Sequence, residues 1–219
     1  MVACRSGVVR TYWPVMNLIV QNFRHAREIL APGLEWSELE DAARRIDRDD
    51  ILAVHDELNE PRSLAGRQPI AGGQSAINEL FRRALEPAGW RTEPRLFEVT
   101  DRSMRGWKMD FIKSAVGVEV SFNHAEAIPW TFTRLNIAGE SLLVEAENRI
   151  DVGVVFFATD ALKKWARMDS AVGTFESAWV WLQLMKPLMP IPILVVGLMP
   201  EFEGRPWEAS EAFRGTRKG

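Results

Sequence analysis

The sequence has very little cysteine and histidine: one cysteine, Cys4, and three histidines stand among 219 residues. One cysteine cannot form a disulfide within the chain, and so few cysteine and histidine ligands exclude a standard structural zinc site. Long apolar runs are missing as well, since the longest candidate, residues 190–200, is bracketed by prolines and falls well short of the roughly 20 residues that cross a bilayer. We therefore expect a protein of the reducing cytoplasm with no membrane-spanning segment.

A strong excess of charge of either sign is also missing. The 27 basic and 30 acidic residues give a formal net charge of −3, which neither requires nor excludes a nucleic-acid partner, because phosphate contacts depend on where the charges lie. With 47% hydrophobic residues, the chain can form one sizeable core, and we expect a single domain over residues 16–219. Residues 1–15 lack the features of a signal peptide, and we interpret them as an N-terminal extension ahead of Met16.

Predicted strands and helices alternate along the chain. Apolar and β-branched stretches predict extended segments over residues 17–22, 95–100, 106–113, 116–122, 151–158 and 191–198. Helical periodicity predicts helices over residues 35–47, 74–90, 131–147 and 174–186, and a short helix from Asp160. The proline- and glycine-rich stretch 59–73 is expected to be a loop. This order implies an α/β fold with a mixed central sheet flanked by helices.

Two acids stand out in the stretch KMDFIKSAVGVEVSF, residues 108–122. Asp110 and Glu119 each lie in a predicted strand among residues that are usually buried, and alternation places Ser121 on the same face as Glu119. If the two strands are neighbours, the carboxylates converge. Together with a backbone carbonyl they would supply the oxygen ligands that a hard divalent ion such as Mg²⁺ prefers. The alternative is a pair of acids at strand ends, solvated or salt-bridged to Lys108 or Lys113.

Four stretches of the sequence occur in an order that resembles a known family. DFIKSAVGVEVSF, from residue 110, resembles the catalytic strands of the type II restriction endonucleases of the BglII and BstYI group, members of the PD-(D/E)xK nuclease superfamily. HAREIL, from residue 25, looks like the first helix of that group, and GQSAINELFRRALEPAGW, from residue 73, is similar to its asparagine-containing helix. IDVGVVFF, from residue 150, resembles the strand that follows.

The resemblance implies a homodimer that binds double-stranded DNA and hydrolyses one phosphodiester in each strand of a short palindrome with a GATC core, using Mg²⁺. Asp110 and Glu119 match the metal-binding carboxylates of the group, and the carbonyl of Val120 would be a further metal ligand. Asn78 matches an active-site asparagine. Lys113 matches a lysine of the pattern. The alternative is that Lys113 is an ordinary surface lysine.

Ser121 is the position where the sequence departs from its relatives. Most of the superfamily has lysine there and this group typically has glutamine, whereas serine is shorter and uncharged. A hydroxyl could still hold the attacking water through a hydrogen bond. Two other functions therefore stay open: a sequence-specific DNA-binding protein with weak or lost cleavage, and a PD-(D/E)xK nuclease of DNA repair or processing.

The resemblance also points to candidate recognition segments after the catalytic strand and around residues 167–174. Asn123 and His124 are the candidates for reading base edges in the major groove, with Ser170 as a weaker one. An equal alternative to base contact is that His124 only marks the start of a helix. The dimer interface is predicted to involve the helix between Trp130 and Leu143.

Overall fold

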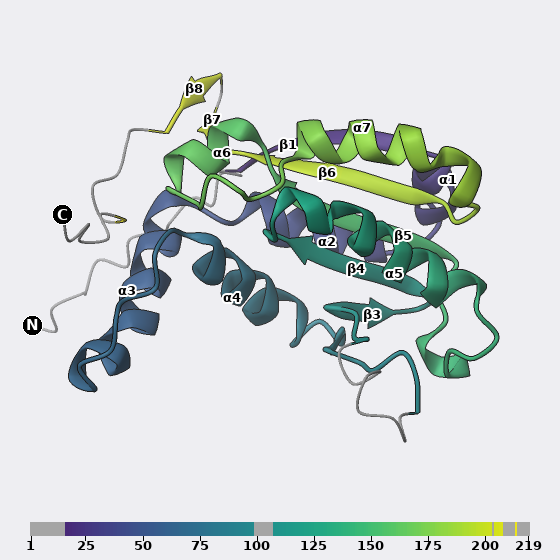
Figure 1. The fold of residues 1–219 in the computed structure, drawn as a ribbon, viewed down its shortest axis with the longest axis horizontal. Helices are drawn as coiled ribbons and strands as arrows, with labels where there is room; N and C mark the ends of the chain where they lie inside the picture. The colour runs from purple at the N-terminus through teal and green to yellow at the C-terminus, as the bar shows by residue number, and fades with distance from the viewer. Residues whose placement is uncertain (1–15, 99–106, 203, 208–212, 214–219) are drawn as a thin grey trace, which may run out of the picture.

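A mixed six-stranded sheet forms the centre of the molecule (Figure 1). The computed structural model describes residues 16–98, 107–202, 204–207 and 213; the predicted N-terminal extension, residues 1–15, and the end of the predicted extended segment 95–100 lie outside the described residues. The six strands are β1 (Asn17–Phe23), β2 (Arg91–Thr92), β3 (Phe111–Lys113), β4 (Val116–Ser121), β5 (Val152–Ala158) and β6 (Ile193–Met199). A separate small hairpin joins β7 (Glu201–Phe202) and β8 (Arg205–Pro206).

The strand order in the sheet is β1-β6-β5-β4-β3-β2. The three central strands β4, β5 and β6 run parallel, and the strands outside them pair antiparallel. All residues of β4 and β5 are buried, as expected for central strands with both faces covered. The predicted mixed sheet is therefore confirmed.

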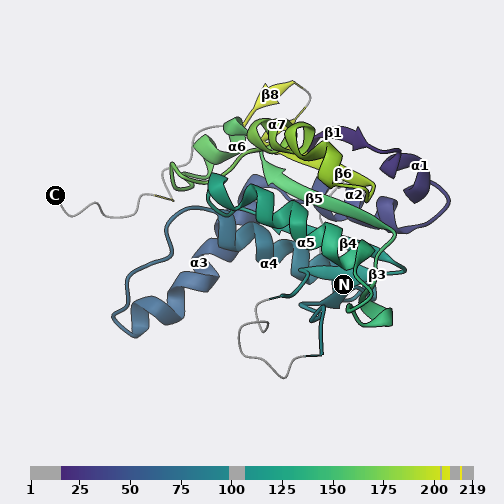
Figure 2. The same ribbon diagram turned by 45° about the vertical axis from the view of Figure 1, so that its right-hand side comes forward.

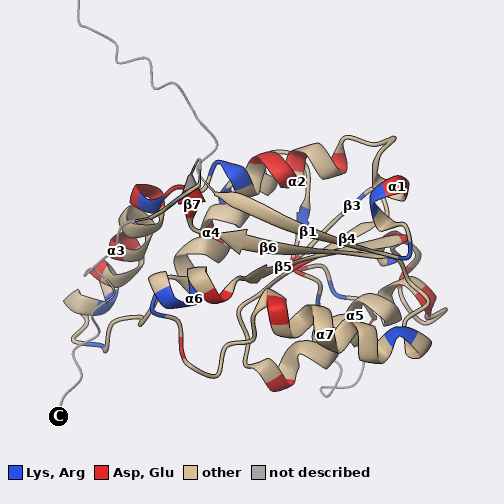
Figure 3. Cartoon of the chain, turned by 90° about the horizontal axis from the view of Figure 1, so that it is seen from above, with Lys and Arg blue, Asp and Glu red and all other residues tan. Residues whose placement is uncertain are grey.

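Helices cover both faces of this sheet, and Figure 3 shows α2 and α4 on one side and α5 and α7 on the other. The helices are α1 (Ala26–Leu30), α2 (Glu35–Arg44), α3 (Arg48–Leu64), α4 (Gln74–Leu85), α5 (Ile128–Glu140), α6 (Asp160–Trp165) and α7 (Phe175–Met185), with short 3-10 turns η2 (Ala125–Ala127), η3 (Ala146–Asn148) and η4 (Lys186–Leu188). Val116, Val118 and Val120 pack into the core below α2 and α4, whereas Val155 and Phe157 pack into the core below α5 and α7. Every helix in the described part of the chain is too short or too polar to cross a bilayer.

The prediction of a loop over residues 59–73 is wrong for residues 59–64. α3 continues to Leu64 and contains Pro61 in its last turn, where one missing N–H removes only one backbone hydrogen bond. The helix starts at a clear N-cap, because the Asp47 carboxylate accepts a hydrogen bond from the backbone N–H of Asp50 at 2.7 Å. Figures 1 and 2 both show α3 projecting beyond the sheet.

Several other predicted segments are shorter in the structure than expected. Of the described part of the segment 106–113, which begins at Trp107, only Phe111–Lys113 is a strand, so Asp110 lies one residue before β3 rather than within it. The helix predicted over 131–147 begins earlier, at Ile128, and ends at Glu140.

Candidate active site

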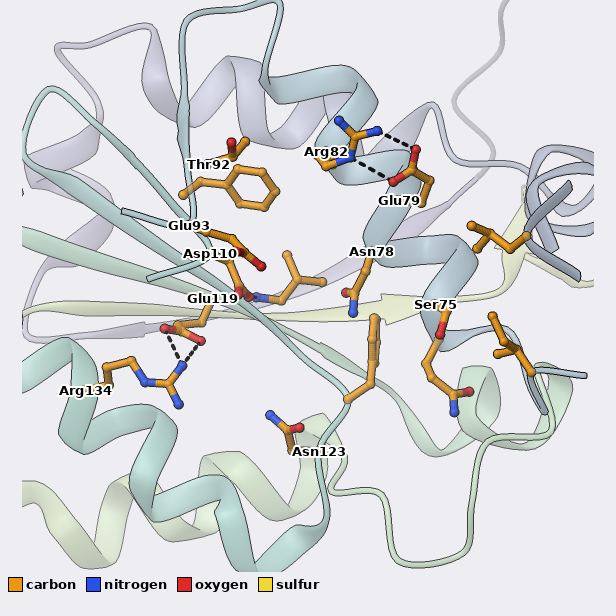
Figure 4. Close-up of a pocket in the computed structure, with 16 residues that line it drawn as sticks. Ser75, Asn78, Glu79, Arg82, Thr92, Glu93, Asp110, Glu119, Asn123 and Arg134 are labelled. Carbon is orange, nitrogen blue, oxygen red and sulfur yellow. Dashed lines mark hydrogen bonds and ion pairs between the residues drawn. The ribbon is translucent and has the colours of Figure 1, made fainter. Parts of the chain in front are cut away.

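A tight hairpin between β3 and β4 brings the two acids together. Ser114 and Ala115 form its two-residue turn, both with positive φ (47° and 61°), as the favoured hairpin turns require. Phe111 pairs with Val118 in the resulting register. One step further along, Asp110 faces Glu119 across the hairpin, as Figure 4 shows.

Asp110 is held by the strand opposite. Its Oδ2 accepts a hydrogen bond from the backbone N–H of Val120 at 2.8 Å. Burial raises the pKa of Asp110, and this effect outweighs the lowering by the Val120 N–H and by the positive charge of Arg134. The carboxylate is therefore oriented by the backbone while its charge remains only partly compensated.

Glu119 is the more deeply buried of the two acids, with 3% of its surface exposed. Nη1 of Arg134, from α5, donates hydrogen bonds to both carboxylate oxygens, at 2.9 and 2.8 Å. Burial, and then the neighbouring Asp110, raise the pKa of Glu119 well above its usual value despite this ion pair. A second cation would relieve the repulsion between the two acids.

A cavity of about 540 Å³ opens beside this pair (Figure 4). It is lined by both acids and by Asn78 from α4, Glu93, Asn123 and Arg134, among other residues. The structure therefore brings Asn78, Asp110, Glu119, Val120 and Asn123 together around one hollow.

A second arginine of this cavity, Arg82, is already neutralised. Its guanidinium contacts both oxygens of Glu79, at 2.7 and 2.8 Å, and Glu86 at 2.7 Å. Hydrogen bonds from Arg82 and Arg83 outweigh the effect of partial burial and lower the pKa of Glu79 to about 2. Arg82 therefore contributes little net charge to the hollow.

Two of the predicted catalytic residues do not line the cavity. Nζ of Lys113 donates to both oxygens of Glu38 at 2.7 Å and to the carbonyl of Ala88 at 2.8 Å. Ser121 is buried, and its Oγ lies 3.3 Å from Oγ1 of Thr131 on α5. Serine at this position thus points between strand and helix rather than toward the acids.

The alternative interpretation of the acids, a salt bridge to Lys108 or Lys113, is wrong. Lys108 pairs with Glu93 at 2.7 Å, and Lys113 pairs with Glu38. The partner that the structure reveals is Arg134, which sequence reasoning missed. The sequence did contain a signal for Arg134, because it repeats at helical spacing with three residues of the buried face of α5. These are Thr131, Leu135 and Ala138.

The two predicted recognition segments lie side by side. His124 forms a β-bridge with Val172, and the N–H of Gly173 donates to the carbonyl of Asn123 at 2.8 Å. Lys163 fixes the neighbouring loop, since its Nζ donates to the carbonyls of Ser170 and Val172 at 2.7 and 2.6 Å. The side chains of Asn123, His124 and Ser170 are exposed. His124 also directly precedes η2, which agrees with its alternative interpretation as a residue at the start of a helix.

The donor set of the hollow fits a hard divalent ion. Two carboxylates with raised pKa values lie together, and an asparagine side chain and the backbone of Val120 line the same space. These are all oxygen-bearing groups, and Mg²⁺ fills its remaining positions with water or phosphate. Within the described residues, no group of three or more histidine, cysteine or acidic side chains is placed to hold a metal ion by side chains alone.

Comparison with known proteins decides the family. The family model described as restriction endonuclease BglII/BglIII matches residues 18–198. The chain belongs to the BglII/BglIII restriction endonuclease family. Members of this family are type II site-specific deoxyribonucleases, so the protein is an enzyme that binds and cuts DNA.

Two solved structures of BglII share the fold of this chain. The structure of BglII complexed with a DNA 16-mer has a TM-score of 0.63 and 18% sequence identity, over 85% of this chain and 78% of that one. The structure of free BglII has a TM-score of 0.52 and 17% identity, over 85% of this chain and 81% of that one. A comparison with curated proteins finds no similar chain.

Proposed function

We propose that this endonuclease hydrolyses phosphodiester bonds of double-stranded DNA at a short palindrome with a GATC core, with Mg²⁺ held by Asp110, Glu119 and the carbonyl of Val120. The observation that carries the proposal is the pair of facing carboxylates at the rim of a 540 Å³ hollow. When bound there, the ion would polarise a phosphate oxygen and lower the pKa of an attacking water. The GATC core comes from the family resemblance.

The residues of the chain have separate tasks in this proposal. The Val120 N–H fixes the direction of the Asp110 carboxylate, so that its free oxygen faces the hollow. Asn78, exposed on α4, can position a phosphate or a water by hydrogen bonds. Asn123 and His124, next to the loop that Lys163 fixes, would read base edges from the rim.

Cleavage of unmethylated plasmid by purified protein in Mg²⁺ tests this function. Wild-type protein should give discrete fragments, whose ends reveal the site and the cut position by run-off sequencing. The Asp110→Asn and Glu119→Gln variants should give none, while Glu140→Gln, an exposed glutamate at the end of α5, should cut like wild type. Random degradation that survives both active-site substitutions would show a contaminating nuclease and count against the proposal.

A second candidate function is sequence-specific DNA binding with weak or lost cleavage. The observation that favours it is Ser121, whose hydroxyl faces Thr131 instead of the hollow. Under this alternative, wild-type protein retards one DNA sequence selectively in Ca²⁺ and gives no product in Mg²⁺.

We propose further that the enzyme acts as a homodimer, because a two-fold assembly matches a palindrome. Apolar side chains form an exposed stripe on α7 and the turn after it: Val180, Trp181, Leu184 and Leu188 are 58%, 40%, 70% and 69% exposed. α5 packs beside α7 and adds Trp130, 62% exposed. The interface expected on the helix between Trp130 and Leu143 is therefore extended to α7.

A further inference from the structure

Arg134 is the charged residue of the hollow whose role the family pattern leaves open. It stands on α5, three residues after Thr131, and the two helix positions face alternate residues of β4: Thr131 meets Ser121, and Arg134 meets Glu119. Position 121 on β4, where most of the superfamily has lysine, holds a neutral hydroxyl turned away from the acids. Arg134, about one helical turn after Thr131, carries a guanidinium that reaches Glu119.

The guanidinium of Arg134 has donors to spare. Only Nη1 contacts Glu119, and within the described residues Nε and Nη2 have no hydrogen-bond partner. The side chain is 26% exposed and lines the same hollow as Asp110 and Asn78. Figure 4 shows it at the edge of that hollow, facing Glu119.

Arg134 is also the point of the hollow at which an anionic ligand can bind. All three side-chain nitrogens of Arg82 contact Glu79 or Glu86, whereas among the described lining residues Arg134 keeps two nitrogens that make no hydrogen bond. Arginine presents its N–H groups in a planar fork that matches two oxygens of a phosphate. A phosphate placed within reach of the two acids therefore also lies within reach of Nε or Nη2.

We propose that Arg134 contacts the scissile phosphate of bound DNA and supplies the positive charge that position 121 lacks. Its free nitrogens donate hydrogen bonds to a non-bridging phosphate oxygen, on which negative charge builds up as the attacking water adds. The contact with Glu119 holds the guanidinium ready before DNA arrives. This inference rests on the proposed function, because it requires the phosphate to lie at Asp110 and Glu119.

The dependence of DNA binding on salt tests the contact without requiring cleavage. Each phosphate contact contributes about 0.9 to the slope of log K against log salt. In a fixed concentration of Ca²⁺, the Arg134→Gln variant should therefore show a slope smaller by about one, whereas Arg134→Lys, which keeps the charge, should keep the wild-type slope. Arg45→Gln is the control, because Arg45 is an exposed, ion-paired arginine that does not line the hollow, and this variant should also keep the slope.

Cleavage in Mg²⁺ gives the second measurement. Arg134→Gln should lower kcat about 100-fold or more, with a melting transition that shows a folded protein. If the Gln variant does not fold, Arg134→Met, which removes the charge and keeps the apolar stem, carries the test, and an unchanged slope in that variant would overturn the contact.

Each pattern of outcomes separates the two proposals. A slow Arg134→Gln enzyme with an unchanged salt slope means that Arg134 only positions Glu119, and a fast one means that it has no role; either overturns the inference. If wild-type protein binds DNA but never cuts, the proposed function fails, and the salt slope alone still decides whether Arg134 contacts a phosphate.

Discussion

Ser121 and Thr131 face each other across β4 and α5, with their hydroxyl oxygens 3.3 Å apart and buried. Thr131 also lies 3.4 Å from the carbonyl of Ala127, so each hydroxyl has a partner within the protein. This pairing turns the side chain of Ser121 away from the hollow that the two acids line.

The first prediction concerns this pair. Ser121→Ala should change the cleavage rate by less than about threefold, because the hydroxyl does not face the acids. It should lower the free energy of unfolding by about 1 kcal/mol, the contribution of one buried hydrogen bond. Steady-state cleavage and urea unfolding measure the two effects. A large fall in kcat with unchanged stability would mean that Ser121 holds the attacking water after all.

The second prediction concerns Lys113, which matches a family lysine but lies away from the hollow. Its ion pair with Glu38 and its bond to Ala88 are half-buried. We expect Lys113→Met, which keeps the apolar stem, to lower the free energy of unfolding by about 1 kcal/mol while Ca²⁺-dependent DNA binding stays intact. Unfolding curves and gel retardation test this, with the exposed Lys164→Met as control. Loss of DNA binding in a stable Lys113→Met protein would place the lysine at the substrate.

The third prediction concerns pH. The folded-state pKa of Glu119 lies above its unfolded value of 4.5, so its contribution to stability is present below pH 4.5 and is lost as the pH rises through the folded-state pKa. Metal-free wild-type protein should thus lose stability over this window, and Glu119→Gln should show a flatter profile. Urea midpoints in EDTA at a series of pH values measure it, and Glu140→Gln should follow wild type. Parallel profiles for wild type and Glu119→Gln would contradict the raised pKa.

The fourth prediction concerns the apolar stripe on α7. Leu184→Glu places a charge at its centre and should convert a dimer into a monomer, as sedimentation equilibrium can show. The matched control is Leu64→Glu, another exposed leucine (84%) at the end of α3. If both variants sediment like wild type, the stripe is not the interface. If Leu184→Glu is a monomer, it is also expected to nick plasmid rather than linearise it, because one subunit cuts one strand.

The strands that build the site could be predicted from the sequence because their residues alternate or form unbroken apolar runs. β4 and β5 are confirmed almost to the residue. Asp110 and Glu119 could be predicted to converge because a two-residue hairpin leaves few registers.

The contacts between distant elements could not be predicted in the same way. The pairing of Glu119 with Arg134 depends on the height and rotation of α5 above β4, which no spacing in the sequence determines. The whole of α3 was missed, since residues 48–58 were assigned to no element and the proline- and glycine-rich stretch 59–73 was expected to be a loop. The segment after α3 is anchored to it, because the backbone N–H of Ile70 donates to Asn59 at 2.6 Å.

The two-residue turn between β3 and β4 has a consequence for how this chain can change. Inserting or deleting a single residue there would rotate every later side chain of β4 to the opposite side of the sheet. Glu119 would then enter the apolar layer under α4 while a valine took its place beside Arg134. Such a length change would damage folding and chemistry together, so homologues and engineered variants that keep the activity should vary in the composition of this turn and hold its length constant.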